Sequence, residues 1–216
     1  MEQIITEIMK QFELNESKIF SIDEFYYLAS KNTVKSVFSN LEKNNEIHKV
    51  LNGLYVKPYY SEFLQEYSYP TPDEVARKIA DKFSWKICEG SDKVLNLLGL
   101  STQVPNKYIY ISDGPYRKYD YRGREIVFKH TNIDGIFSYS REFALMVVAI
   151  RAIGKSKFTD VHLYKLTRYA KYYIKENFDE NTIKLPFWIK KVIAEIKDSN
   201  EEKWEELRKK VLSRKS

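Results

Sequence analysis

The sequence predicts an α+β protein with an N-terminal winged helix, a small middle unit with antiparallel strands and a C-terminal helical bundle. Three observations lead to this prediction. Helical periodicity up to residue 45 is followed by a β-hairpin signal, residues 107–130 hold three short β-rich runs, and the pattern is helical from Ser140 onward. The chain has 216 residues, 43% hydrophobic and 31% charged, so it can bury a core and is typical of a globular protein.

We place the three parts at residues 1–68, 69–138 and 139–216. The net charge of +6 is uneven, because residues 139–216 carry 18 basic and 11 acidic side chains, whereas residues 1–60 carry 7 and 8. A basic surface favours a polyanionic partner such as DNA or RNA. A lysine-rich, solvated helical surface would explain the same composition.

Several classes of protein are disfavoured by simple counts. The longest uncharged apolar run, residues 143–150, is far shorter than the roughly 20 residues of a membrane span, and the first residues are acidic where a leader is basic. The single Cys88 cannot form an internal disulfide, and His48, His130 and His162 lack metal-ligand spacing. We therefore expect a cytoplasmic protein without membrane association, metal or cofactor.

Three helices and a hairpin are expected in the first part. Apolar residues at helical spacing predict a helix over residues 4–12, and Asp23 is the expected N-cap of a second helix over residues 24–30. A third helix is expected over residues 32–45. The dipeptide Asn52-Gly53 lies between two β-rich runs and favours a two-residue hairpin turn with positive φ. This order of elements is that of a winged helix.

In a winged helix the third helix enters the major groove, where short polar and cationic side chains contact base edges and phosphates. The hairpin adds phosphate contacts, with Lys57 as one further cation. The alternative is a protein-interaction or dimerisation unit, which the net charge of −1 over residues 1–60 favours. The candidate DNA-binding residues are Lys31, Asn32, Thr33, Lys35, Ser36, Ser39, Asn40, Lys43, Lys49 and Asn52.

The middle part begins near residue 70. Thr71 and Glu74 form a capping-box pattern around Pro72 and predict a helix that buries residues from Val75 to Phe83. A strand over residues 85–88 and a helix over residues 91–100, with Ser91 as N-cap and Gly99 as terminator, follow. Three strands over residues 107–112, 117–121 and 124–130 are then expected to form a meander.

Three motifs occur together in this order: LGLSTQVP (Leu98–Pro105), SDGP (Ser112–Pro115) and GREIVFKHT (Gly123–Thr131). With them the chain resembles the AbiEi-type antitoxins of type IV toxin–antitoxin (abortive infection) systems. The resemblance extends to NGLYVKP, REFALMVVAIRAIG and LPFWIKKVIAEI, so it covers nearly the whole chain. It implies a bacterial antitoxin whose winged helix represses its own operon. The remainder would counteract a separately encoded nucleotidyltransferase toxin without requiring a stable complex.

Polar groups near the turns of the middle part are the candidates for antitoxin activity. Two arginines among them can bind phosphate bidentately. The alternative is that these polar groups simply form a solvated surface of the β-sheet. These candidates are Gln103, Asp113, Arg117, Arg124, Lys129 and His130.

No catalytic constellation is evident. The patterns GxxxxGK[ST], GxGxxG, HExxH and GxSxG are absent from the sequence. Asp113, Glu125 and Lys129 resemble a nuclease set, but three residues separate the last two where alternate strand positions need one. We expect no catalytic residues. The alternatives are a stand-alone winged-helix regulator and an enzyme that reverses the toxin's modification.

The last part is expected to be a small helical bundle. Helices are predicted over residues 140–153 and 160–177, from Pro186 onward, and around Trp204. Their polar faces could contact RNA or an acidic toxin surface. The basic residues on these faces are Arg168, Lys171, Lys175, Lys190, Lys191 and Lys197.

Overall fold

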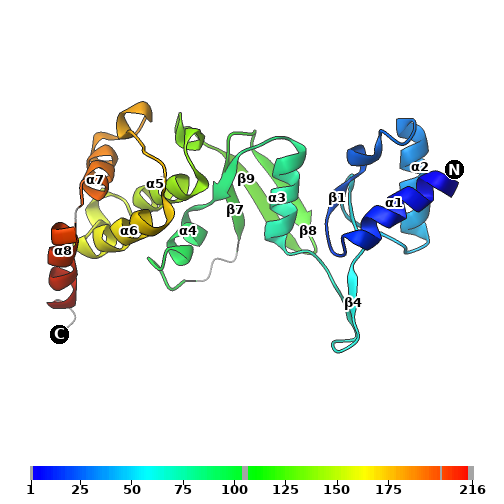
Figure 1. The fold of residues 1–216 in the computed structure, drawn as a ribbon, viewed down its shortest axis with the longest axis horizontal. Helices are drawn as coiled ribbons and strands as arrows, with labels where there is room; N and C mark the ends of the chain where they lie inside the picture. The colour runs from blue at the N-terminus through cyan, green and yellow to red at the C-terminus, as the bar shows by residue number, and fades with distance from the viewer. Residues whose placement is uncertain (1, 104–106, 200, 214–216) are drawn as a thin grey trace. The chain divides into compact units, whose positions relative to one another are not determined.

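A computed structural model describes residues 2–103, 107–199 and 201–213, which form a mixed α+β fold as the sequence predicts (Figure 1). The chain divides into two compact units, Met1–Trp85 with Asp120–Arg124 and Lys86–Tyr119 with Glu125–Ser216. In this division the helix after residue 70 groups with the first unit, and the middle strands, apart from residues 120–124, group with the C-terminal helices. Among the described residues, no helix is long and apolar enough to span a membrane.

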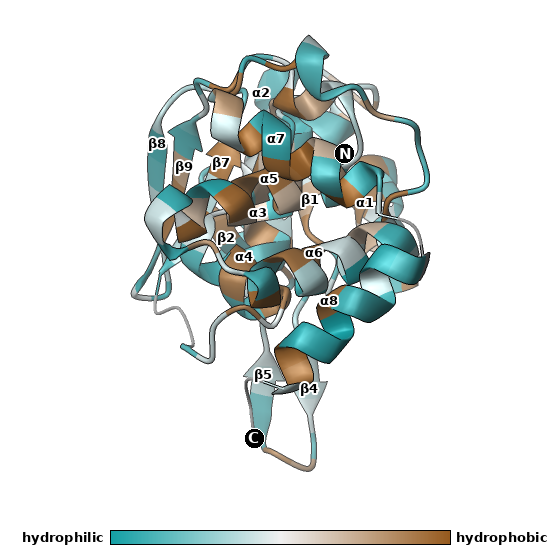
Figure 2. Ribbon diagram, turned by 90° about the vertical axis from the view of Figure 1, so that its left-hand side faces the viewer, coloured by the Kyte–Doolittle hydropathy of each residue, from teal (hydrophilic) through white to brown (hydrophobic). Residues whose placement is uncertain are grey.

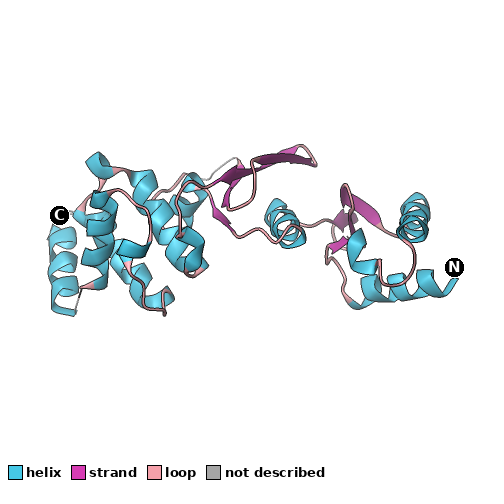
Figure 3. Ribbon diagram, turned by 90° about the horizontal axis from the view of Figure 1, so that it is seen from above, coloured by secondary structure: helices cyan, strands magenta, loops and turns pink. Residues whose placement is uncertain are grey.

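The first unit opens with the element order of a winged helix, and Figure 3 colours its strands magenta and its helices cyan. Strand β3 lies between β1 and β2 and is antiparallel to both. The elements are α1 (Glu2–Leu14), β1 (Phe20–Ser21), the 3-10 helix η1 (Ile22–Phe25), α2 (Lys31–Lys43), β2 (His48–Leu51) and β3 (Leu54–Val56).

An aromatic cluster forms the core of this winged helix. Phe38 of α2 is fully buried, and its ring centroid lies 6.2 Å from that of Phe12, 5.3 Å from that of Phe25 and 4.9 Å from that of Tyr55. Aromatic pairs at such distances add to the hydrophobic contribution of burial. The cluster therefore fixes which face of α2 is buried and which remains exposed.

Two local predictions for the winged helix are wrong. The second helix is only the 3-10 turn η1, because Ser21 rather than Asp23 is its N-cap and the Ser21 N–H donates to Glu24 Oε1 at 2.7 Å. The second wrong prediction is that of a hairpin turn with positive φ at both Asn52 and Gly53. Gly53 has a φ of 73°, but Asn52 is not among the described residues with positive φ. The hairpin itself is confirmed, with Leu51 paired to Leu54.

A two-stranded arm that the sequence did not predict follows the wing. Strands β4 (Tyr59–Ser61) and β5 (Glu66–Ser68) pair antiparallel, and Phe63 between them is 93% exposed. Gln65 has a φ of 52° and allows the reversal without glycine. The arm ends at the helix that starts with Pro72.

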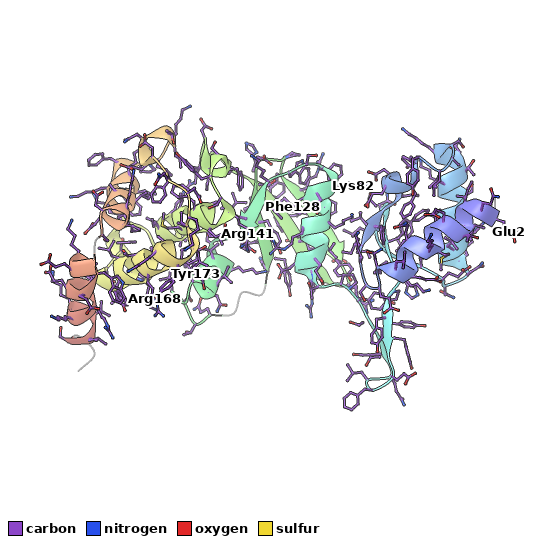
Figure 4. All side chains as sticks on the ribbon, viewed as in Figure 1. Glu2, Lys82, Phe128, Arg141, Arg168 and Tyr173 are labelled. Atoms are coloured by element: carbon purple, nitrogen blue, oxygen red, sulfur yellow. The ribbon has the colours of Figure 1, made fainter. Side chains whose placement is uncertain are left out.

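Helix α3 (Pro72–Lys82) has the predicted capping box and completes the first unit. It is tied to η1 by ion pairs of Lys82 with Asp23 at 2.9 Å and of Lys78 with Glu24 at 2.6 Å; Lys82 is labelled in Figure 4. Phe83, predicted to be buried, is 48% exposed because it is the C-cap residue beyond the last buried turn.

Most of a four-stranded sheet, with the strand order β6-β7-β9-β8, belongs to the second unit. The predicted meander is wrong, because β7 and β9 pair in parallel. The physical reason is that β9 has three consecutive buried residues, Ile126, Val127 and Phe128, as a strand covered on both faces does, and so takes a central position. The strands are β6 (Ile87–Glu89), β7 (Tyr108–Ser112), β8 (Arg117–Tyr121) and β9 (Arg124–His130).

Helices α4, α6 and α7 pack against α5, in which nine of 13 residues are buried; the apolar residues of α5 appear brown in Figure 2. Its predicted boundaries are confirmed by the Ser140 N-cap and by Gly154, which has a φ of 77°. The N-cap of helix α4 is Gly90 and not the predicted Ser91. A side chain is excluded at residue 90, because a Cβ there would lie 2.8 Å from the Ile109 carbonyl oxygen. The helices are α4 (Ser91–Leu97), α5 (Arg141–Ile153), α6 (Asp160–Tyr173), α7 (Phe187–Lys197) and α8 (Glu201–Ser213).

Candidate nucleic-acid interfaces

Helix α2 presents a polar face that contains no acidic residue in its first turn. The helix begins at Ser30, whose hydroxyl accepts a hydrogen bond from the Thr33 N–H at 3.2 Å. Its buried stripe faces the aromatic core. Of the predicted DNA-binding residues on this helix, Lys31, Asn32, Lys35, Ser36, Asn40 and Lys43 are exposed, whereas Thr33 and Ser39 are half-buried.

Not all of these side chains have the same role. The Thr33 and Ser30 hydroxyls lie 2.8 Å apart, so Thr33 takes part in the cap of the helix. The Lys31 ammonium lies 5.6 Å from the centroid of the Tyr26 ring. Lys35 and Asn40 are exposed beyond the capping turn and lie on opposite sides of the polar face, because residues five apart are about 140° apart around a helix.

The wing supplies one clear cation. Lys49 on β2 and Asn52 in the turn are both exposed, as expected. Lys57, however, forms an ion pair with Glu13 at 3.2 Å, which offsets its charge. Lys49 is therefore the wing lysine best placed to meet a phosphate.

A second polar cluster of the first unit includes one of the predicted antitoxin residues. Arg122 has a φ of 52°, and its guanidinium carbon lies 3.9 Å from the centroid of the Tyr69 ring. The Tyr69 hydroxyl in turn lies 2.7 Å from Nδ1 of His48. Tyr69, Arg122 and Arg124 line a cavity of about 380 Å³. Arg122 and Gly123 connect the strands predicted over residues 117–121 and 124–130, but nothing in the sequence indicated that this turn lies beside Tyr69.

The SDGP motif is a structural turn in the second unit. The Asp113 carboxylate accepts a hydrogen bond from the Lys86 N–H at 2.8 Å, and the Asp113 N–H donates to the Lys86 carbonyl at 3.2 Å. Nδ1 of His130 lies 2.9 Å from the Gly114 carbonyl oxygen, and because a carbonyl only accepts, this nitrogen carries the proton. Asp113 thus closes the β6–β7 pair, and Gly114 orients His130.

The structure gives the predicted antitoxin residues different surroundings. Lys129 and His130 line the same cavity of about 330 Å³, whereas Arg124 lines the cavity beside Tyr69. Arg117 is exposed on β8, and Gln103 is exposed after α4, where its carbonyl accepts from Asn96 at 3.1 Å. Residues 104 and 105, which end the LGLSTQVP motif, lie outside the described residues.

Helix α6 carries an aromatic and basic groove that sequence reasoning missed. The groove has a volume of about 570 Å³, and Tyr172 and Tyr173 on it are 60% and 62% exposed. Burial raises the pKa of Tyr169, also in the groove, to about 12. Arg168, one of the predicted basic residues, directly precedes Tyr169 in the sequence and lines the same groove. The helical spacing of the tyrosines was the signal available in the sequence.

The described part of the chain contains potential metal ligands and a single thiol, that of Cys88. Among residues 2–103, 107–199 and 201–213, no group of three or more His, Cys, Asp or Glu side chains could hold a metal ion. Cys88 is 1% exposed, and burial raises the pKa of its thiol to about 12. The thiol of Cys88 is thus buried and remains protonated near neutral pH.

Comparisons with known proteins identify the family without assigning an activity. Neither the curated proteins nor the solved structures include a match to the chain. Residues 4–178, which run from α1 past the end of α6, match DUF6088, a family of unknown function. This match covers most of the chain, and the protein therefore belongs to the DUF6088 family.

Proposed function

We propose that the protein is a DNA-binding transcriptional repressor that reads its operator with α2. The observation that carries this proposal is the exposed polar face of α2, with no acid in its first turn, on a winged helix whose aromatic core fixes the opposite face. A helix presented in this way matches the major groove in width and in hydrogen-bonding character. Such a role on bacterial promoter DNA would place the protein in the cytoplasm.

Base and backbone contacts would come from different side chains. Asn40 is suited to adenine, because a side-chain amide can donate and accept at the same base edge. Lys35, Lys43 and Lys49 are exposed and suited to phosphates. Sequence specificity and overall affinity for DNA would thus depend on different side chains, which can be replaced one at a time.

The test is the double variant Lys35→Ala with Asn40→Ala, compared with Lys157→Ala with Asn177→Ala. Both pairs remove one exposed lysine and one exposed asparagine, and the control pair lies in the second unit. We expect the first variant to lose operator binding while its circular dichroism spectrum and melting temperature stay unchanged. Retained operator binding by this folded variant would refute the assignment of α2.

The resemblance in the middle motifs supports a more specific role for this repressor. We propose that it is the antitoxin of a type IV toxin–antitoxin system, which represses its own operon and counteracts a nucleotidyltransferase toxin without requiring a stable complex. A nucleotidyltransferase gene beside its own, together with rescue of growth on co-expression, would support this role. Absence of such a gene would favour a stand-alone regulator.

An enzyme that reverses the toxin's modification remains the alternative mechanism of rescue. Arg124→Ala and His130→Ala are the variants that separate the two mechanisms. Loss of rescue with stability and operator binding preserved would favour the enzyme, whereas full rescue by both variants would contradict it.

The groove on α6 supports single-stranded RNA binding as a second candidate function. Exposed tyrosines can stack on bases while Arg168 contacts the backbone. We expect Tyr172→Ala with Tyr173→Ala to weaken binding of a labelled single-stranded RNA at least about tenfold, since stacking contributes about 1–3 kcal/mol per base. The control removes two comparably exposed tyrosines of the arm, Tyr59 and Tyr60. Equal binding by both variants would exclude this groove.

A further inference from the structure

We infer that the second unit contains a binding site for a phosphorylated small molecule of nucleotide size. The site is the cavity of about 330 Å³ beside β7 and β9, which we call the basic cavity. Its lining includes four cationic side chains and two isoleucines. These residues are Lys93, Lys107, Lys129, Arg151, Ile109 and Ile111.

The parallel pairing of β7 and β9 brings part of this lining together. Lys107 directly precedes β7 and alternates with Ile109 and Ile111, so the three residues share one face. Ile111 is the register partner of Lys129, which places Lys129 on the same face of the neighbouring strand. Lys93 comes from α4 and Arg151 from α5, so four different segments converge on one cavity.

The charge around the basic cavity is strongly unbalanced. Asp92 is the one carboxylate in the lining, against four cations. Within the described part of the chain, Lys107 and Lys129 have no ion pair, and Arg151 donates to the neutral Asn132 side chain at 3.3 Å. Like charges gathered in a concave site create a positive potential that favours a multiply charged anion.

The size and chemistry of the lining define the class of ligand. A volume of about 330 Å³ lies at the small end of the range typical of ligand sites, so it suits a mononucleotide. The isoleucines offer an apolar wall for a base or sugar, while lysine and arginine side chains bind phosphate through charge-assisted hydrogen bonds. Nucleoside di- and triphosphates combine these features. The inference concerns binding alone and does not depend on the proposed DNA-binding function.

The test is fluorescence anisotropy of ATP labelled on its ribose, with wild-type protein and two double variants. Lys107→Ala with Lys129→Ala removes two cations of the basic cavity, and Lys155→Ala with Lys157→Ala removes two exposed lysines outside its lining. We expect the cavity variant to raise Kd at least about tenfold, because hydrogen bonds to charged groups are lost, and the control to change it less than about twofold. Unchanged operator binding and melting temperature in the cavity variant would separate this result from any failure of the first unit.

Competition experiments with unlabelled compounds show which part of the ligand the basic cavity recognises. Unlabelled ATP and inorganic triphosphate should both displace the probe, whereas adenosine should not. Three results would overturn the inference: no binding by the wild type at millimolar nucleotide, equal losses in the cavity and control variants, or displacement by adenosine as efficient as by ATP.

Discussion

Separate replacement of Lys35 and Asn40 distinguishes the two kinds of contact that α2 would make with DNA. Helix α2 and the wing together expose four lysines, Lys31, Lys35, Lys43 and Lys49. Each neutralised phosphate contributes about 0.9 to the slope of log K against log salt concentration. If all four contact phosphates, one protomer gives a slope of about −3.6.

The two variants should then change different quantities. Lys35→Ala should make the slope shallower by about 0.9 and weaken operator and random DNA by the same factor. Asn40→Ala should leave the slope unchanged and reduce the preference for the operator by about 1–3 kcal/mol, which is the discrimination of one good base contact.

Fluorescence anisotropy with labelled operator and random duplexes, at several salt concentrations between about 50 and 200 mM, measures both quantities. An unchanged slope in Lys35→Ala would refute the phosphate contact. If Asn40→Ala weakened both duplexes equally, the assignment of Asn40 to a base edge would be wrong.

Three further predictions concern stability and reactivity. Phe38→Ala should lower the free energy of unfolding by about 3–5 kcal/mol in urea denaturation, and Phe63→Ala by less than about 0.5 kcal/mol, because the first ring is fully buried and the second is 93% exposed; equal losses would contradict the described core. Cys88, with a pKa of about 12, should not react with a thiol reagent at pH 8 until the protein unfolds, and rapid labelling of the folded protein would disprove its burial. Burial and the nearby Lys165 lower the pKa of His162, whose neutral ring accepts from the Thr159 N–H at 3.1 Å. The contribution of neutral His162 to the free energy of unfolding should be fully present above pH 6.5, its usual pKa, and be lost as the pH falls through the lowered native pKa. His162→Ala should therefore remove part of the loss of stability at acidic pH. An unchanged dependence of stability on pH in this variant would argue against this role.

Local signals predicted many of the helices correctly. The Thr71 capping box acts within a few residues and is found at the predicted place, and the caps Ser140 and Gly154 of α5 agree with the predicted range of residues 140–153. The exposed face of α2 was predictable for the same reason, since the spacing of Val34, Val37, Phe38 and Leu41 defines the buried stripe.

Features that depend on distant residues were not predictable in this way. The order of the sheet follows from burial of β9 on both faces, and the apolar run from Ile126 to Phe128 was a signal only in retrospect. The arm was missed because its reversal uses Gln65 at positive φ, where glycine or asparagine is usual. The cations of the basic cavity come from four separate segments, so no sequence motif joins them.

The central claim, that the winged helix reads an operator, is tested most directly by a gel-shift measurement. The purified protein is titrated into the DNA upstream of its own gene and into random DNA of equal length, at a low and a high salt concentration. We predict a shift of the upstream DNA at a lower protein concentration than the random DNA, weakened by salt. No shift, or equal shifts of both DNAs, would contradict the account and direct attention to the second unit, with RNA or a protein as its partner.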